Sequence, residues 1–307
     1  MDIETLRLTL EVSRRLSFVA VASARGVDPS KVSRAVAQAE ASLGARLFQR
    51  TTRRMSLTAA GERFCARLEG VIDAYDEARE LARSDEARPR GRLRLTASTA
   101  FGETMIAPRL GDFRARYPDV TLDLRWADAA VDLIAEGVDL AVRHGPPINA
   151  GAAYEVRTLR PTRYVLCARP DWVAARRLID PASLDGAPAV AYALPAPKTR
   201  WFFRRRGASH RGSIEIQPAA IAASPLTVLQ LARSGVGPAI VADWLCGADL
   251  ASGALVDAAP DFEFSHGDFD AAARMIFPRT SRVPRKTQAM TAFLKEALGA
   301  RSNASRD

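Results

Sequence analysis

Residues 26–44, which read GVDPSKVSRAVAQAEASLG, contain the pattern that decides the fold of the first part of the chain. Asp28 and Pro29 form a strong helix start, because the carboxylate can accept hydrogen bonds from first-turn amides and the proline stands where no amide donor is needed. Apolar residues then recur at intervals of four, three and four, which predicts a helix with one buried face. These residues are Val32, Val36, Ala39 and Leu43.

Two shorter helices are predicted before this one. Ile3, Leu6 and Leu10 stand at helical spacing, and Ser17 is the expected N-cap of a second helix that runs through about residue 24. Gly26 supplies a tight turn between the second helix and the third. Two helices joined in this way are typical of the helix-turn-helix motif, whose second helix enters the major groove of DNA.

The polar face of the third helix suits this use. Arg34 can donate two hydrogen bonds to guanine, and the other side chains can bond base edges or phosphates. A solvated face of an ordinary amphipathic helix fits this stretch, taken alone, about equally well. The candidate DNA contacts are Ser30, Lys31, Ser33, Arg34 and Gln38.

The next segment favours the DNA-binding interpretation. Residues 47–50 and 54–57 are predicted as two short strands joined by residues 51–53, and more than half of the net charge of +9 falls within residues 25–60. Such a hairpin beside a recognition helix would follow phosphates or enter the minor groove. The basic residues at its tip are Arg50, Arg53 and Arg54.

Residues 17–18, 26–34, 40, 43–48 and 50–61 together closely resemble the N-terminal signature of LysR-type transcriptional regulators, in the subgroup whose wing reads RTTR. The resemblance implies that residues 1–60 form a winged helix-turn-helix domain that binds double-stranded promoter DNA. Arg25 and Ala39 stand where the family usually has leucine, and Arg25 is expected to snorkel or pair. Lys31 stands where a small residue is common in the family. It is expected to add a contact to DNA that changes the operator sequence the protein recognises.

Residues 61–88 are predicted as one long helix with Thr58 as candidate N-cap. At about 1.5 Å per residue it would be about 40 Å long, too long to bury its apolar stripe against a small head. A twin helix from another subunit is therefore expected to cover it, although the chain's own C-terminal half is the alternative. The stripe has heptad-like spacing: Phe64, Leu68, Val71, Tyr75, Ala78 and Ala82. Residues 89–91 then break the helix and are predicted to form a hinge.

Short strands and helices alternate after the hinge, which predicts an α/β domain with a parallel sheet over residues 92–300. The predicted strands are residues 93–97, 120–126, 139–143, 164–168, 239–241 and 273–277, and the predicted helices are residues 101–117, 129–136, 170–177, 225–234 and 285–298. The overall fold class is thus α followed by α/β.

The resemblance continues through this region at residues 91–95, 100–102, 116–120, 137–143, 165–168 and 250–255. It implies a two-lobed effector domain like that of periplasmic binding proteins. Lobe I would comprise residues 92–161 and 268–300, lobe II residues 162–267, with chain crossings near 159–162 and 262–270. Residues 301–307 are expected to form a flexible tail.

A small-molecule effector is expected between the lobes, because ligands of open α/β sheets bind where strands end and helices begin. Hydroxyl groups and helix N-termini there suit a carboxylate or another anion. The candidate effector contacts are Ser98, Thr99, Phe101, Arg143, His144, Trp201 and Ser224. Several of these residues have an alternative role that involves no effector. In that case Ser98 and Thr99 only cap a helix, Arg143 forms a structural ion pair, and His144 is a solvated loop residue.

Other functional classes find little support in the sequence. Motifs for nucleotide binding, nucleophile elbows and zinc proteases are absent, and the three histidines lack metal-ligand spacing. We therefore expect no enzyme activity, no metal and no cofactor. The three cysteines are expected to be reduced and packed. With no long apolar run and no signal peptide, a cytoplasmic protein without a membrane partner is expected.

The expected partners are promoter DNA, the effector and further copies of the chain. The long helix predicts a dimer, a homotetramer follows from the resemblance, and RNA polymerase is a further candidate. One alternative is a small-molecule-binding protein or enzyme whose basic head serves assembly. A non-specific architectural DNA binder is another, but it would leave two-thirds of the chain unexplained.

Arg53→Ala is expected to weaken binding to duplex DNA of any sequence. The slope of log affinity against log salt should flatten by about 1, because one phosphate contact is lost. Titrations at several salt concentrations measure this slope. An unchanged slope would mean that the wing does not touch phosphate.

Overall fold

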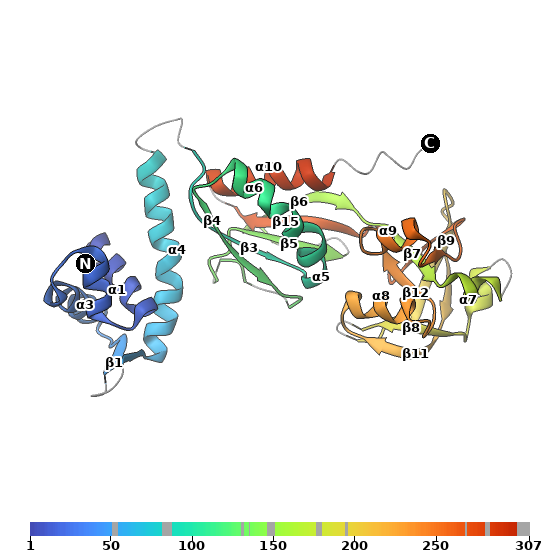
Figure 1. The fold of residues 1–307 in the computed structure, drawn as a ribbon, viewed down its shortest axis with the longest axis horizontal. Helices are drawn as coiled ribbons and strands as arrows, with labels where there is room; N and C mark the ends of the chain where they lie inside the picture. The colour runs from blue at the N-terminus through green and yellow to red at the C-terminus, as the bar shows by residue number, and fades with distance from the viewer. Residues whose placement is uncertain are drawn as a thin grey trace.

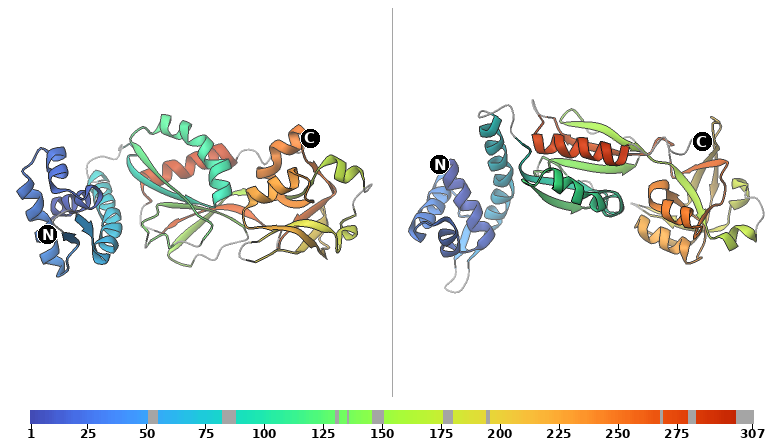
Figure 2. Two further views of the ribbon diagram at one scale, coloured as in Figure 1. Left: turned by 60° about the horizontal axis from the view of Figure 1, so that its bottom comes forward. Right: turned by 45° about the horizontal axis from the view of Figure 1, so that its top comes forward.

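A computed structural model describes residues 1–50, 55–81, 88–129, 132–134, 136–145, 151–175, 180–193, 196–267, 269–279 and 283–299. It shows three bodies in a row: an N-terminal head, lobe I and lobe II (Figure 1). Helix α4 stands between the head and lobe I in Figure 1, and the two further views in Figure 2 keep the same order. Among the described residues, no helix combines the length and apolar composition that a membrane span requires.

The head contains three helices, a two-stranded hairpin and the long helix α4. Its sequence-predicted N-caps are confirmed: the Ser17 side chain accepts from the Ala20 amide, and Asp28 accepts from the Ser30 amide. Apolar side chains from the first three helices and the hairpin form one core, which includes Val12, Val21, Val32, Val36 and Leu47. The bounds are α1 Ile3–Arg15, α2 Phe18–Arg25, α3 Pro29–Leu43, β1 Phe48–Arg50, β2 Met55–Leu57 and α4 Ala59–Leu81.

The sequence periodicity placed Leu43 on the buried face of α3, but in the structure it does not belong to that face. It is 37% exposed, because it is the last residue of the helix and Gly44 then turns the chain in the left-handed region at φ +63°. The other three residues of the predicted stripe, Val32, Val36 and Ala39, are fully buried.

Helix α4 begins as predicted, with the Thr58 hydroxyl accepting from the Gly61 amide. Its apolar residues do not form a single seam. Leu68, together with Cys65 and Ile72, is buried against Leu10 of α1, whereas Val71 and Tyr75 remain 55% and 45% exposed. Part of the predicted stripe is therefore covered by the chain's own head. Ala82 lies outside the described residues.

Lobe I is a five-stranded sheet in the order β4-β3-β5-β15-β6, with helices packed on one face. Strand β3 pairs in parallel with β4 and β5, whereas β15 is antiparallel to β5 and β6. The sheet is therefore mixed, and the prediction of a parallel sheet was wrong for this lobe. The strands are β3 Gly91–Ala97, β4 Val120–Trp126, β5 Leu140–Gly145, β6 Tyr154–Pro161 and β15 Ala272–Pro278. The helical segments are α5 Thr99–Phe101, the π-helical turn η1 Gly102–Ile106, the 3₁₀ turn η2 Ala107–Arg109, α6 Leu110–Arg116 and α10 Arg285–Gly299.

Two features of lobe I departed from the predicted pattern. The helix expected over residues 129–136 is absent from the described part of that range, where turns are closed by the Val138 amide on the Leu133 carbonyl at 2.7 Å. A π-helical turn begins at Gly102, where an added Cβ would lie 2.6 Å from the Trp126 ring. Close packing of that ring therefore requires glycine at this position.

Lobe II is built on an eight-stranded mixed sheet in the order β10-β9-β14-β7-β12-β8-β11, with β13 paired to β7. The strands are β7 Tyr164–Ala168, β8 Pro188–Tyr192, β9 Arg200–Arg205, β10 Gly212–Glu215, β11 Gln217–Ala222, β12 Ala239–Ala242, β13 Val256–Asp257 and β14 Phe262–Ser265. The helices are α7 Pro170–Ala174, the 3₁₀ turn η3 Pro181–Leu184, α8 Pro225–Arg233 and α9 Asp243–Ser252. Helices α8 and α9 cover one core of the lobe, and Trp201 lies in another. The three cysteines are buried free thiols, as predicted.

The chain passes between the lobes twice. It leaves lobe I after β6 and enters β7 two residues later, and it returns between β14 and β15. Lobe II is thus inserted into lobe I, and both connections lie side by side between the two sheets.

Glu40→Ala is expected to destabilise the head by about 1–3 kcal/mol. One oxygen of Glu40 accepts from the amides of Leu47 and Phe48, at 2.7 and 3.0 Å, and so attaches the hairpin to α3. Removing the acceptor leaves two buried donors unpaired. Amide hydrogen exchange resolved by mass spectrometry measures the stability of the head separately from the lobes. Glu40→Gln, which keeps an acceptor oxygen, is the matched control, and equal protection in both variants would contradict the assignment.

Candidate DNA-binding face and inter-lobe pocket

The N-terminal half of α3 presents a continuous exposed face. Ser30, Lys31 and Arg34 are exposed, and Ser33 is half-buried beside them. The Arg34 Nε donates to the Ser30 carbonyl at 3.3 Å, one turn earlier, which leaves the end of the guanidinium directed away from the core. Gln38 is exposed one turn further on, and its Oε1 accepts from the Thr5 hydroxyl at 3.5 Å.

The hairpin lies beside this face because Glu40 of α3 holds its first strand. Strands β1 and β2 pair antiparallel, with Arg50 opposite Met55. Arg53 and Arg54, the other two residues expected at the tip, lie outside the described residues.

Arg25, an unusual residue type at its position in the sequence pattern, forms ion pairs, as expected. Its Nε lies 2.9 and 3.1 Å from the two carboxylate oxygens of Glu11, and its Nη1 lies 3.1 Å from Glu4. The hydrogen bonds from Arg25 also hold the pKa of the Glu11 carboxyl below its ordinary value, although burial opposes this. Arg25 therefore joins α2 to α1 and does not belong to the exposed face of α3.

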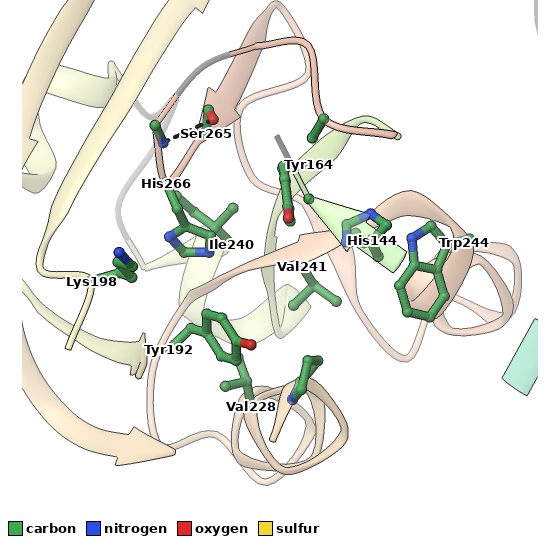
Figure 3. A pocket seen from close by; sticks show the side chains of 15 residues that line it. His144, Tyr164, Tyr192, Lys198, Val228, Ile240, Val241, Trp244, Ser265 and His266 are labelled. Carbon is green, nitrogen blue, oxygen red and sulfur yellow. Dashed lines mark hydrogen bonds between the residues drawn. The ribbon is translucent and has the colours of Figure 1, made fainter. Parts of the chain in front are cut away.

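A cavity of about 510 Å³ lies between the lobes (Figure 3). Lobe I contributes the end of β5, lobe II contributes residues of β7, β8, β12, α8 and α9, and the return crossing closes one side. The residues that line it are His144, Gly145, Tyr164, Tyr192, Lys198, Pro225, Val228, Ile240, Val241, Ala242, Trp244, Ser265, His266, Gly267 and Ala271.

His144 connects both lobes at this pocket. Its Nε2 lies 2.8 Å from the hydroxyl of Thr162 in the first crossing, and its backbone amide donates to the Ser98 hydroxyl at 3.4 Å. Its ring stacks near Phe101 and meets Trp244 edge-on, with centroid distances of 6.3 and 5.4 Å. Burial lowers the pKa of His144 to about 4, and the nearby positive charges of Arg274 and Arg160 act in the same direction.

His266 lies in the return crossing, on the other side of the pocket. Burial, aided by the charge of Lys198, lowers its pKa to about 4. The rings of Tyr164 and Tyr192 lie 5.4 and 5.8 Å from it. Burial also raises the pKa of Tyr164 and of Tyr192 to about 12 each. At neutral pH all four rings are therefore uncharged.

Of the seven sequence-predicted effector contacts, His144 alone is among the lining residues of this cavity. Ser98 and Thr99 lie at the end of β3, where the Thr99 amide donates to Asp128 at 3.0 Å. Phe101 is buried in the lobe I core behind His144. Arg143 donates to the Thr96 hydroxyl at 3.2 Å, and burial lowers its pKa. Ser224 precedes the lining residue Pro225 as N-cap of α8, without a side-chain capping bond.

Trp201 does not face the pocket, contrary to the sequence-based expectation. It is fully buried in the lobe II core, and its indole nitrogen donates to the Lys198 carbonyl at 3.2 Å. The pocket residues that sequence reasoning missed are Tyr164, Tyr192, Lys198, Trp244 and His266. A signal was present for one of them, because His266 is one of only three histidines and lies in a predicted crossing.

The effector domain is expected to lose stability when the pH falls from about 6.5 towards about 4. The unfolded chain takes up protons near the ordinary histidine pKa of 6.5, whereas folded His144 and His266 stay neutral to about pH 4. Each of His144→Gln and His266→Gln should reduce this dependence by about 1 kcal/mol per pH unit near pH 5. Urea midpoints at several pH values measure the effect, with His210→Gln at an exposed position as control. An unaltered pH dependence in both pocket variants would refute the assignment.

Comparison with known proteins identifies two families along the chain. Residues 3–62 match the bacterial regulatory helix-turn-helix proteins of the lysR family, and residues 86–299 match the LysR substrate binding domain. Within the ranges described above, no cluster of three or more potential ligands could hold a metal ion.

Similar proteins extend over nearly the whole length. The probable transcriptional regulator LtrA of Klebsiella pneumoniae is 28% identical over 96% of this chain and 94% of its own. The regulator DmlR of Escherichia coli is 31% identical over 84% of this chain and 83% of its own. The structure of CrgA, a LysR-type regulator from Neisseria meningitidis, shares the fold at a TM-score of 0.57 and 24% identity, covering 97% of this chain and 99% of its own. The chain belongs to the LysR family of transcriptional regulators, with an N-terminal helix-turn-helix domain followed by a substrate-binding domain.

Proposed function

We propose that this LysR-type regulator binds an inverted-repeat operator in double-stranded promoter DNA and responds to a small, anionic effector in the inter-lobe pocket. The observation that carries the proposal is the exposed face of α3, formed by Ser30, Lys31 and Arg34 beside a hairpin with a basic tip. In this arrangement α3 lies in the major groove of one half-site. Arg34 and its neighbours Ser33 and Gln38 contact base edges or adjacent phosphates.

The wing adds contacts that do not depend on sequence. Arg50, Arg53 and Arg54 hold phosphates or enter the adjacent minor groove, and they supply the salt-dependent part of the affinity. Base contacts from α3 and phosphate contacts from the wing then fix the register of one head on one half-site.

A second copy is needed to read an inverted repeat, because a two-fold site requires a two-fold protein. Helix α4 offers the surface for it. Val71, Ala74, Tyr75 and Ala78 are exposed on the side of α4 that is not packed on α1. Pairing of two such helices would bury these residues and place two heads side by side. A tetramer, formed by two of these dimers, would bring four heads to a promoter and present them to RNA polymerase.

The effector is proposed to act on the angle between the lobes. Both chain crossings border the pocket, through His144 with Thr162 at the first and His266 at the second. A ligand that contacts both would favour one arrangement of the lobes over another. Lobe I is joined to α4 by ion pairs of Glu69 with Arg92 and Arg94, so a change in lobe arrangement can reach the heads.

Selection and sequencing of random duplex DNA retained by the full-length protein tests the operator proposal. We expect a short inverted repeat, and we expect Arg34→Ala to bind it about 1–3 kcal/mol less tightly. Arg200→Ala, at an exposed position in lobe II, is the matched control for loss of one positive charge. If the Arg34 variant bound the repeat as tightly as the control, α3 would be misassigned as the recognition helix. Recovery of only sequence-independent, salt-sensitive binding would instead favour an architectural protein.

A further inference from the structure

The charge inventory of the pocket is unusually simple. Among the described lining residues, Lys198 is the only one that carries a formal charge at neutral pH, since both histidines are neutral there. No aspartate or glutamate belongs to that set. Lys198 is half-buried and forms no ion pair with any residue that the structure describes. The described lining therefore offers one positive charge without an ion-pair partner and no negative charge.

The rings around the pocket form a continuous series that includes residues of both lobes. Tyr192, His266 and Tyr164 follow one another at centroid distances of 5.8 and 5.4 Å. Tyr164 then meets His144 at 6.0 Å and His144 meets Trp244 at 5.4 Å, both edge-on. The aliphatic side chains of Val228, Ile240 and Val241 line the same space. A planar apolar body would thus find aromatic and aliphatic contacts over most of its surface.

Several polar atoms of the lining lack a partner. The hydroxyl groups of Tyr164 and Tyr192 point towards the same central space in Figure 3 and bond to no residue in the described part of the chain. The Trp244 Nε1 and His266 Nδ1 are buried, and neither has a hydrogen-bond partner among the described residues. Buried polar groups are normally paired, so unpaired groups at a cavity indicate a ligand or ordered water.

We propose that the effector is an aromatic compound with a single carboxylate. This inference rests on the proposed function and specifies the chemistry of its ligand. The carboxylate pairs with Lys198, and the planar ring lies along the series of rings, with the tyrosine hydroxyls donating to its polar groups. A cavity of about 510 Å³ is within the usual range for small-molecule sites, and it accommodates one or two rings.

The same inventory disfavours other ligand classes. A dianion or polyphosphate would bring charges for which the described lining has no second cation, and burying an unpaired charge is costly. A cationic ligand would face Lys198 without any carboxylate to pair with it. A saturated ring of equal charge is thicker than a planar one, and it gives up the edge-to-face contacts.

The test measures binding to the full-length protein in the absence of DNA, by calorimetry and by the shift in melting temperature. Benzoate and 2-naphthoate are the probes. Cyclohexanecarboxylate keeps the charge without planarity, benzamide keeps the ring without charge, phthalate doubles the charge and benzylamine reverses it. We expect the better of the two aromatic monocarboxylates to bind at least about tenfold more tightly than each of these four compounds.

Lys198→Met separates the charge contribution from that of the ring. We expect it to weaken carboxylate binding about tenfold or more, while the affinity for benzamide stays the same. Lys295→Met, at an exposed position on α10, is the matched control and should leave all affinities unchanged. Unchanged carboxylate binding in the Lys198 variant would overturn the proposed pairing.

The remaining outcomes also decide the question. Tightest binding of phthalate, benzylamine or cyclohexanecarboxylate would overturn the inference, and so would failure of both aromatic probes to bind at about 10 mM. Operator selection, carried out on the same preparation without effector, distinguishes this from failure of the proposed function. A protein that selects an inverted repeat but binds no aromatic monocarboxylate remains an operator-binding regulator with a different effector.

Discussion

The arrangement of the head beside lobe I depends on one buried guanidinium, that of Arg94. Its Nη2 lies 2.5 Å from Glu69 of α4, its Nε 2.8 Å from Asp123 of β4, and its Nη1 donates to the carbonyls of Glu136 and Gly137 at 2.7 and 3.1 Å. Burial would raise the pKa of the Asp123 carboxyl, but the arginines bonded to it hold that pKa at about 2. Because a buried charge without partners is costly, these elements keep their places together.

The strand that carries Arg94 also leads to the pocket. Strand β3 runs from Gly91 to Ala97, about 20 Å at the usual rise per residue, and the hydroxyl of the next residue, Ser98, accepts from the His144 amide. The contacts with α4, made by Arg92 and Arg94, and the contact with the pocket, made by Ser98, thus follow one another along one strand. This strand is an inner strand of its sheet, paired with β4 on one side and with β5 on the other.

Local patterns in the sequence predicted many of the helices and strands, but not which side chains would come together in the folded chain. The caps at Ser17, Asp28 and Thr58 and the strand over residues 164–168 follow from short-range chemistry, and the structure confirms them. Trp201 was misplaced because its burial depends on the pairing of β9 with both β10 and β14, and β14 is distant in sequence. Tyr192 and Lys198 are close in sequence, but His266 meets Tyr192 only because β14 brings the chain back to the pocket, which local sequence patterns do not reveal. Of the residues expected to contact an effector at strand ends, His144 of lobe I is among those that line the pocket.

Insertion of lobe II into lobe I has a consequence for synthesis on the ribosome. Strand β15 lies between β5 and β6, so the sheet of lobe I lacks an inner strand until residues 272–278 emerge. The head and α4 are complete some two hundred residues earlier, and domains generally fold in order of emergence. A nascent or prematurely terminated chain therefore carries a finished head without a finished sensor. Such a fragment has the helix-turn-helix domain without a complete substrate-binding domain, so any ligand control that depends on both lobes is lost from it.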